Sequence, residues 1–484
     1  MHNQEYSAAM THDLHKELMA HLVREDREED LIFTLWAPSQ GDKRLTALVH
    51  TPVFPEEGDR QRHCNASFNS QYLERVLKLA MEKKCGISFM HSHPGPGWQG
   101  MSHDDVVAEN RLMGSVAAVT GLPLLGMTTG SDGTWSARFW VDIDGKSYER
   151  QWCSSVRVIG KTLSASFNDQ QLKQPEFNEM FKRTVTVWGK KNHSHIARLK
   201  IGIVGLGSVG GAVAMSLARM GLTRLVFIDF DEIQLHNLDR LDYATKKDLG
   251  LLKIDVAKQR ALEVSTASTL DIDTFPYSVA EELGYKAALD CDVIFSGVDR
   301  PRPRSILNHF AYAHLIPVID GGIDVRFKNG DFSGVDWQLQ TVGPERPCLE
   351  CLGAFTSDDV STEIEGSLDN PSYISGLPDN HRFRRNENVY PFSQNLASLE
   401  VMQFIALTTA CGGRDDFGVQ RFRYNPGIME SNTERCCRPS CMTAALTATG
   451  DSHFHLFGKD IGAEEARLRQ KSCSTPSLKE ICHA

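Results

Sequence analysis

A glycine-rich turn between an apolar strand and a helix is the feature that most constrains how this chain folds. The string KIGIVGLGSVGGAVAMSLARMG joins a short apolar run, the glycines Gly205, Gly207 and Gly210, and a helical segment. These glycines permit a tight turn and let phosphate oxygens approach backbone amides at a helix N-terminus. The apolar runs RLVFIDFD, CDVIFSGVD and IPVIDGG follow, alternating with helical segments. This alternation predicts an α/β, Rossmann-like, doubly wound sheet in the C-terminal half.

Asp229 ends the strand predicted in RLVFIDFD, where its carboxylate is placed to accept hydrogen bonds from ribose hydroxyls. A glycine turn followed by such an aspartate fits NAD as well as ATP. The turn alone therefore leaves both nucleotides open.

The segments that follow favour ATP. FIDFDEIQLHNLDR, Lys253 and FSGVDRPRPRSILNHFA resemble the ThiF/MoeB family of ubiquitin-like-protein activating enzymes, and IPVIDGG matches that family too. The resemblance implies an adenylyltransferase whose residues around ATP and magnesium are Asp229, Asn237, Arg240, Lys253 and Asp299, with Asp231 as a weaker companion. Two cations at this spacing would neutralise a triphosphate while a carboxylate attacks the α-phosphorus, and Asp299 would hold Mg²⁺. An NAD oxidoreductase needs neither, and stays the remote alternative.

The helix FKRTVTVWG, which precedes the first strand, resembles the family segment that supplies an arginine across a dimer. Arg183 is the matching residue, and a simple surface arginine is the alternative. The family resemblance also implies a homodimer.

A second chemical motif lies near the N-terminus, in HSHPGPGWQGMSHDD. His91 and His93 alternate along the end of a strand, so both imidazoles face one side, and Asp105 follows on the next helix. Two imidazoles, one carboxylate and an open fourth position make a catalytic zinc set. Taken singly, the histidines are an ordinary pair, and Ser102 with Asp105 is an ordinary helix capping box.

The joint pattern resembles the JAMM (JAB/MPN) metalloprotease family and predicts an α+β domain of that type. The resemblance implies that His91, His93 and Asp105 bind zinc and that Ser102 stabilises the oxyanion of the tetrahedral intermediate. The family also needs an upstream glutamate as general base. In REEDLIFTLW the match is Glu29, with Glu28 as the alternative because the acidic cluster leaves the register open.

Cysteine pairs predict a second, structural zinc site. PCLEC supplies Cys348 and Cys351, and RCCRPSC supplies Cys437 and Cys441, with Cys436 able to replace Cys437. Two such pairs build a closed tetrahedral site. After Cys351 the next cysteine is Cys411, so the intervening loop offers hydroxyls in place of the thiol that many activating enzymes acylate.

Composition and patterning place these motifs in an expected domain order. The chain has 484 residues and a formal net charge of −10. This acidic balance argues against nucleic acid as the main partner, and no apolar stretch is long enough for a membrane span or a secretory signal. We expect a cytoplasmic protein with a JAMM/MPN domain at 1–154, a connector helix region at 155–198, an activating domain at 199–458 and a polar tail at 459–484.

Together the motifs predict zinc-dependent cleavage of a small ubiquitin-like protein with a C-terminal glycine, combined with ATP- and Mg²⁺-dependent adenylation of its exposed carboxylate. A conjugating-enzyme-like protein is a further expected partner. The main alternative is adenylation for sulfur transfer, without protein conjugation. A non-catalytic binding scaffold is the third hypothesis.

Overall fold

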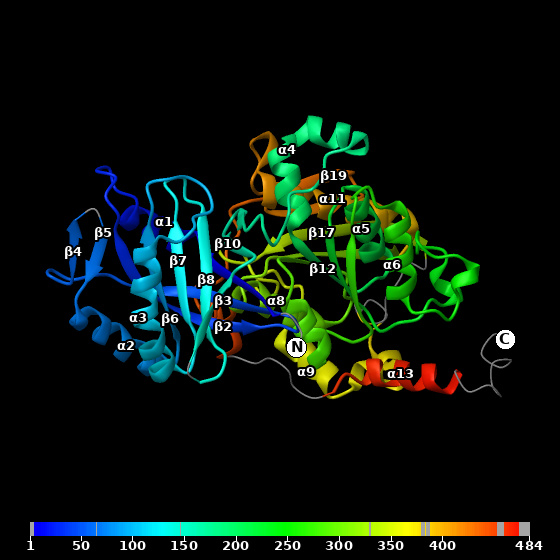
Figure 1. The fold of residues 1–484 in the computed structure, drawn as a ribbon. Coiled ribbons are helices and arrows are strands. Elements are labelled where there is room, and N and C mark those ends of the chain that lie inside the picture. Colours follow the sequence, from blue (N-terminus) through cyan, green and yellow to red (C-terminus); the bar gives the residue numbers. More distant parts are fainter. Residues whose placement is uncertain are drawn as a thin grey trace. The chain divides into compact units, whose positions relative to one another are not determined.

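The computed structural model describes residues 4–63, 65–145, 147–328, 331–378, 383, 388–452 and 459–473. The chain divides into two compact units, each built on its own sheet (Figure 1). Unit 1 comprises 1–174, 312–315 and 446–454, and unit 2 comprises 175–311, 316–445 and 455–484. No helix in the described part of the chain is long and apolar enough to cross a membrane.

Unit 1 is a mixed sheet covered by helices. Within its described residues the strand order is β11-β10-β1-β3-β2-β6-β7-β8-β9, beside a small β4-β5 hairpin. Its elements are β1 (Glu5–Thr11), α1 (His12–Leu22), β2 (Leu31–Gln40), β3 (Arg44–Val53), β4 (Arg60–His63), β5 (Asn65–Phe68), α2 (Ser70–Lys83), β6 (Gly86–Ser92), α3 (His103–Thr120), β7 (Leu124–Thr129), β8 (Trp135–Asp142), β9 (Tyr148–Trp152), β10 (Ser155–Ile159), β11 (Leu163–Phe167) and η7 (Gly450–Ser452).

Strand β2 shows why helices cover both faces of this sheet. Successive side chains of a strand point to opposite faces. Leu31 and Phe33 join the core formed with α2 and α3, whereas Ile32 and Trp36 join the core formed with α1. Because both sets are apolar, the strand is buried on both sides, and α1 lies across the sheet from α2 and α3 (Figure 1).

A buried ion pair ties α3 to the sheet. Arg138 of β8 donates to the carboxylate of Glu109 through Nε at 3.1 Å and through a second nitrogen, and Trp140 Nε1 donates to Glu109 at 2.6 Å. Both charged side chains are fully buried. Removing one partner leaves the other charge buried and uncompensated, so we expect Glu109→Ala to lower the unfolding free energy of unit 1 by about 3–5 kcal/mol. Urea denaturation of the variant checks this, and an unchanged midpoint would contradict it.

Unit 2 is a second sheet, parallel on one side and antiparallel on the other. Its described strand order is β14-β13-β12-β15-β16-β17-β18-β19, and the strands from β14 to β16 run parallel. Its elements are η1 (Glu179–Phe181), α4 (Lys182–Arg198), β12 (Lys200–Val204), α5 (Ser208–Arg219), β13 (Arg224–Ile228), η2 (Leu235–Asn237), η3 (Lys246–Asp248), α6 (Lys253–Val264), β14 (Asp271–Phe275), α7 (Glu282–Leu289), β15 (Val293–Ser296), α8 (Pro301–Ala313), β16 (Val318–Lys328), β17 (Asp331–Val342), α9 (Ser357–Ile364), η4 (Ser367–Asp369), α10 (Pro371–Gly376), α11 (Tyr390–Thr409), η6 (Cys411–Gly413), β18 (Val419–Arg423), β19 (Ile428–Asn432), α12 (Met442–Ala445) and α13 (Ile461–Cys473).

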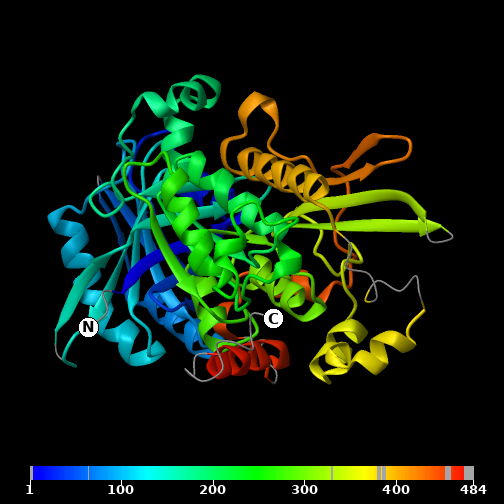
Figure 2. The ribbon, with the colours of Figure 1, turned by 90° about the vertical axis from the view of Figure 1, so that its right-hand side faces the viewer.

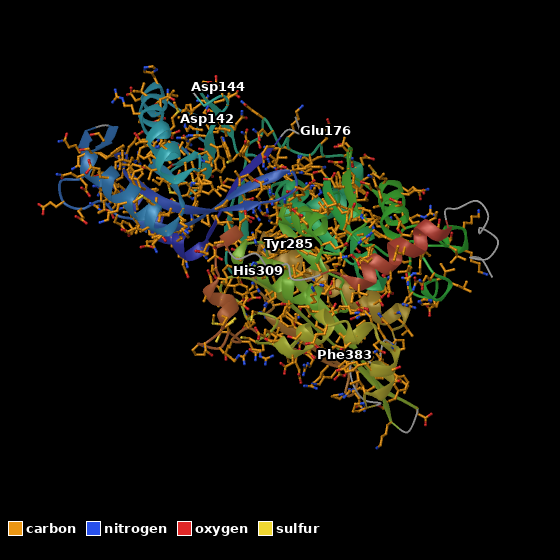
Figure 3. The ribbon with its side chains drawn as sticks, turned by 90° about the horizontal axis from the view of Figure 1, so that it is seen from below. Asp142, Asp144, Glu176, Tyr285, His309 and Phe383 are labelled. Carbon is orange, nitrogen blue, oxygen red and sulfur yellow. The ribbon has the colours of Figure 1, made fainter. Side chains whose placement is uncertain are left out.

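The order of the parallel strands positions a ligand crevice. From β12 the chain passes through α5 to β13 on one side, and β15 pairs with β12 on the other. This is the switch point of a doubly wound sheet, where ligands bind at the carboxyl ends of the strands. Elsewhere in unit 2, Tyr285 of α7 meets Phe310 of α8 edge-on with ring centroids 4.6 Å apart, and Figure 3 labels Tyr285 and the neighbouring His309.

Two expected boundaries differ from the structure. The sequence predicts a connector at 155–198, but β10 pairs with β1 and β11 pairs with β10 inside the sheet of unit 1, while α4 belongs to unit 2. The partner strand β1, itself not expected, lies about 150 residues upstream of β10, so no local pattern reveals the pairing. The expected polar tail contains α13, and its residues 474–484 lie outside the described residues.

Candidate functional site

The pairing of β2 with β6 brings the acidic loop of unit 1 to its histidines. The two strands are antiparallel with Leu31 opposite His91. Glu29 precedes Leu31 by two residues and His93 follows His91 by two, so the register sets Glu29 against His93. Two hydrogen bonds hold this end of the strand pair. The Asp30 amide donates to Ser92 Oγ at 3.1 Å, and the Ser92 amide donates to the Asp30 carbonyl at 3.1 Å.

The three predicted zinc ligands of unit 1 converge. One ligand atom from each of His91, His93 and Asp105 lies within 4.8 Å of the others. His91 Nε2 is 3.2 Å from His93 Nε2 and 3.2 Å from Asp105 Oδ1, and His93 Nε2 is 3.4 Å from Asp105 Oδ2. Glu29 Oε1 stands 4.0 Å from His93 Nε2. The sequence motif therefore folds into one compact cluster.

The same cluster sets the charges of its members. Burial raises the pKa of Glu29, and the nearby His93 and His91 offset only part of this rise. Burial would also raise the pKa of Asp105, but hydrogen bonds from His91 and His93 hold it well below its ordinary value. A carboxylate with a raised pKa is a better base, and one with a lowered pKa stays ionised as a ligand. The two pKa shifts run in the directions that a general base and a metal ligand need.

The turn from β6 to α3 carries Asp105 to the histidines. Ser102 caps α3: its Oγ accepts from the Asp105 amide at 3.1 Å, and the Ser102 amide donates to Asp105 Oδ2 at 2.7 Å. Because Oγ accepts through a lone pair, its proton is still available to an oxyanion. The side-chain Nε2 of Gln99 donates toward three carbonyls of the PGPG loop, including that of Gly97 at 2.7 Å. This loop therefore has a defined shape.

A pocket of about 340 Å³ opens beside this cluster, and both His93 and Glu29 line it. Glu28 also reaches the pocket wall, but its side chain is exposed, whereas Glu29 is partly buried and close to His93. The geometry therefore favours Glu29 over Glu28 as the base.

The donor set of unit 1 fits a zinc ion. Two ring nitrogens and both oxygens of one carboxylate face a common point, and His91 is only 5% exposed. The 3.2 Å between His91 Nε2 and His93 Nε2 lets one metal ion bind both nitrogens. Imidazole and carboxylate are zinc ligands of the catalytic type.

Unit 2 holds the four predicted structural cysteines together. The Sγ atoms of Cys348, Cys351, Cys437 and Cys441 lie within 4.8 Å of one another, and none of the four forms a disulfide. Backbone amides point at sulfur: the Cys348 amide donates to Cys437 Sγ at 3.2 Å, and the Cys351 amide to Cys348 Sγ at 3.4 Å. Four converging sulfurs fit a closed tetrahedral zinc site. Cys436 is exposed and outside the cluster, so Cys437 is the better candidate ligand.

We expect Cys437→Ser to remove one zinc ion per chain and to lower the melting temperature of unit 2, because metal binding free energy contributes directly to folding. Cys436→Ser, one residue away, serves as the matched control and leaves both unchanged. Zinc content by atomic emission and thermal unfolding measure the pair. Equal zinc loss in the two variants would contradict the assignment.

The predicted nucleotide residues of unit 2 surround one pocket of about 850 Å³ at the strand ends. Among the residues that line this pocket are eight of those predicted from the sequence: Gly205, Gly207, Asp229, Asp231, Asn237, Arg240, Lys253 and Asp299. Phe383, labelled in Figure 3, belongs to the same lining. Residues spread over almost 100 positions of sequence thus meet at one place.

The three glycines have distinct roles. Gly205 has φ +89°, and a Cβ there would lie 2.6 Å from the carbonyl oxygen of Gly297. A Cβ on Gly210 would meet the carbonyl oxygen of Gly205 at 2.0 Å, so Gly210 lets α5 pack against the turn instead of lining the pocket. Gly207 faces open space at the start of α5. The turn therefore leaves backbone amides accessible to a phosphate.

Carboxylates fix the lysine of the pocket. Asp229 is buried and accepts hydrogen bonds from the Leu206 amide at 2.6 Å and the Asp231 amide at 2.8 Å, so it holds the glycine turn as well as facing the pocket. Lys253 Nζ donates to Asp231 Oδ2 at 2.7 Å. Burial alone would lower the pKa of Lys253, but Asp229 and Asp231 keep it above its ordinary value. The lysine is therefore a cation.

Two predicted arginines differ in their placement. Arg240 lines the pocket and donates to the His236 carbonyl at 2.6 Å. Arg183, at the start of α4, is exposed and is not among the described residues that line the pocket. Its predicted role across a dimer stays a prediction.

The pocket also contains residues that the sequence motifs did not single out. Arg304 donates to Asp320 Oδ1 at 3.0 Å, and Asp320 accepts from Ser296 at 2.7 Å and Gln340 at 2.9 Å. The signal for this pair was present, since Arg304 and Asp320 lie inside the strings FSGVDRPRPRS and IPVIDGG. Glu465 and Arg469 of α13 line the pocket too, in a segment expected to be a tail.

Several known proteins are similar in sequence to part of this chain. The chain is 28% identical over 151 residues to the tRNA threonylcarbamoyladenosine dehydratase of Escherichia coli, covering 30% of this chain and 54% of that protein. It is 25% identical over 173 residues to the molybdopterin-synthase adenylyltransferase of Salmonella typhimurium, covering 34% of this chain and 63% of that protein. The ubiquitin-like modifier-activating enzyme 5 of Drosophila virilis is 28% identical over 172 residues, covering 33% and 41%. The chain thus spans about half the length of these curated relatives.

Among solved structures, the crystal structure of Escherichia coli MccB with ATP is similar, with a TM-score of 0.42 at 17% identity over 55% of this chain and 74% of that chain. The model of the ThiF family matches residues 181–432, which lie in unit 2 apart from 312–315 and include its glycine turn, its pocket aspartates and its first pair of cysteines. On this match, the chain belongs to the ThiF family.

Proposed function

We propose that unit 2 adenylates the C-terminal carboxylate of a small ubiquitin-like protein with ATP and Mg²⁺, and that unit 1 is a JAMM-type zinc peptidase acting on the same protein. The observation that carries the proposal is the pocket of unit 2, where a lysine cation, an arginine and three aspartates face the accessible amides of a glycine turn. Relatives named adenylyltransferases and modifier-activating enzymes support this chemistry.

In the adenylation, the substrate carboxylate oxygen attacks the α-phosphorus, the bond to the β-phosphate breaks, and pyrophosphate leaves. Lys253 and Arg240 neutralise the charge that develops on the phosphate oxygens. Asp299 supplies carboxylate oxygens, which Mg²⁺ prefers. The amides at Gly207 and the start of α5 bind phosphate at the positive end of a helix.

For the cleavage, His91, His93 and Asp105 would hold zinc. When bound, the metal would supply a nucleophilic hydroxide near neutral pH and polarise the scissile carbonyl. Glu29 takes a proton from the attacking water and passes it to the leaving amine, a role that suits its raised pKa. The Ser102 hydroxyl donates a hydrogen bond to the oxyanion.

Joining the two activities in one chain raises the effective concentration of the adenylating site for the product of cleavage. The second candidate is adenylation for sulfur transfer. It is favoured by the absence of cysteine between Cys351 and Cys411 in the sequence, since a conventional loop thioester would need a thiol there. Covalent adducts of the modifier on other proteins in cells would exclude it.

ATP–pyrophosphate exchange with a panel of small ubiquitin-like proteins ending in Gly-Gly tests the proposal. We expect exchange with at least one panel member and a larger thermal shift with ATP and Mg²⁺ than with NAD. Absence of exchange across the panel, together with a preference for NAD, would contradict the adenylating role.

A further inference from the structure

Helix α13 is attached to unit 2 at both of its ends. Near its start, Arg302 of α8 donates to the Lys459 carbonyl at 2.7 Å. A Cβ added to Gly366 would lie 3.0 Å from Ile461 Cδ1, so Ile461 lies close to this glycine. Near its end, Arg467 forms two hydrogen bonds with Glu281, at 3.0 and 2.5 Å, and Gln470 donates to the Phe230 carbonyl at 3.2 Å. Figure 2 draws α13 in red. Asp460, next to the first attachment, and Phe230, in the second, line the nucleotide pocket.

The faces of α13 match this position. Ala463 and Ala466 are buried, at 0% and 5% exposure, and lie on one face at helical spacing. Gly462, Glu465 and Arg469 recur at positions i, i+3 and i+7 on a neighbouring face, and all three line the pocket. The alanine face of α13 therefore packs on unit 2, and the neighbouring face lines the nucleotide pocket.

Sheet topology identifies the end of the pocket that α13 covers. The glycine turn that receives phosphate follows β12, and the ribose-side Asp229 follows β13. The base therefore lies further along the sheet, toward the end of β14, where Tyr277, Ser278 and Val279 line the pocket. Arg467 stands 5.7 Å from the centre of the Tyr277 ring and pairs with Glu281, just beyond this segment.

We infer that α13 forms the wall of the nucleotide pocket at its base end, and that the Arg467–Glu281 pair and the Gln470–Phe230 hydrogen bond hold it there. The inference rests on the proposed nucleotide site. Arg467 and Glu281 do not line the pocket among the described residues, so they are positioning residues, whereas Glu465 and Arg469 contact the ligand space. Burial raises the pKa of Glu232, another lining residue, and the charge of Arg469 opposes that rise.

Charge reversal and rescue test the inference. In full-length protein, Arg467→Glu is expected to weaken binding of ATP with Mg²⁺ by about tenfold, because a charged, two-bond contact is lost and replaced by repulsion. The double variant Arg467→Glu, Glu281→Arg is expected to regain most of the affinity. Gln470→Ala, a milder change, is expected to weaken binding by about threefold. Isothermal titration calorimetry measures ATP affinity without any knowledge of the modifier.

The matched control is Arg423→Glu, which breaks another arginine–glutamate pair of unit 2, with two bonds of 3.1 Å to Glu430 on the β18–β19 hairpin, outside the pocket lining. It should bind ATP as the wild type does. Unchanged ATP affinity in Arg467→Glu, or in Gln470→Ala should the former not fold, would overturn the inference. Failure of the wild type to bind ATP would instead contradict the proposed function.

Discussion

Glu29→Gln is expected to lower the rate of cleavage by about 100- to 10,000-fold while the zinc content of unit 1 stays unchanged, because general acid–base catalysis contributes an effect of that size. The amide keeps the size of the side chain but accepts no proton. Glu29 stands 4.0 Å from His93 and is not among the three converging ligands. The measurement is release of a C-terminal extension from the ubiquitin-like substrate, with metal content determined on the same sample.

Glu28→Gln is the matched control. It changes the adjacent acidic residue, which also reaches the pocket but is exposed. It should retain nearly full activity. A loss of activity in Glu28→Gln equal to that in Glu29→Gln would show that the chosen register is wrong.

Lys253→Met is expected to lower the rate of ATP–pyrophosphate exchange by at least about 100-fold, since removing one donor from a preorganised charge-stabilising site costs about that much. Lys253 is nearly buried, pairs with Asp231 at 2.7 Å and lines the pocket beside Asp229 and Asp299. Cleavage by unit 1 should be unaffected in the same variant. Exchange and cleavage assays on one preparation separate the two activities.

The control for this variant is Lys247→Met, which removes an exposed lysine six positions earlier that does not line the pocket. Exchange at the wild-type rate is expected. If Lys253→Met and Lys247→Met both exchanged normally, Lys253 would have no role in nucleotide chemistry.

Both candidate sites were accessible from sequence where their residues are close together along the chain. The alternation of His91 and His93 along one strand end places both imidazoles on one side, and Asp105 on the next helix was added through the family resemblance. The glycine turn after β12 is equally local. Such motifs can be recognised because strand and helix periodicity set the direction of each side chain.

Features that depend on distant partners were not accessible. The sequence named Glu29 and Cys437 first but left Glu28 and Cys436 open, because the register of β2 against β6 and the position of the first cysteine pair are needed to separate them. Strand β10 looked like a connector because its partner β1 lies at the other end of unit 1. Helix α13 looked like a tail because the buried residues among its described side chains are alanines, which carry little apolar signal.

The most direct test of the joint activity compares two forms of one ubiquitin-like protein in ATP–pyrophosphate exchange with the full-length chain. One form ends at its terminal glycine, and the other carries extra residues beyond it. The account predicts that the wild type exchanges with both forms, and that His91→Ala exchanges with the mature form alone. Equal exchange of the extended form by wild type and His91→Ala would show that cleavage in unit 1 does not feed adenylation in unit 2.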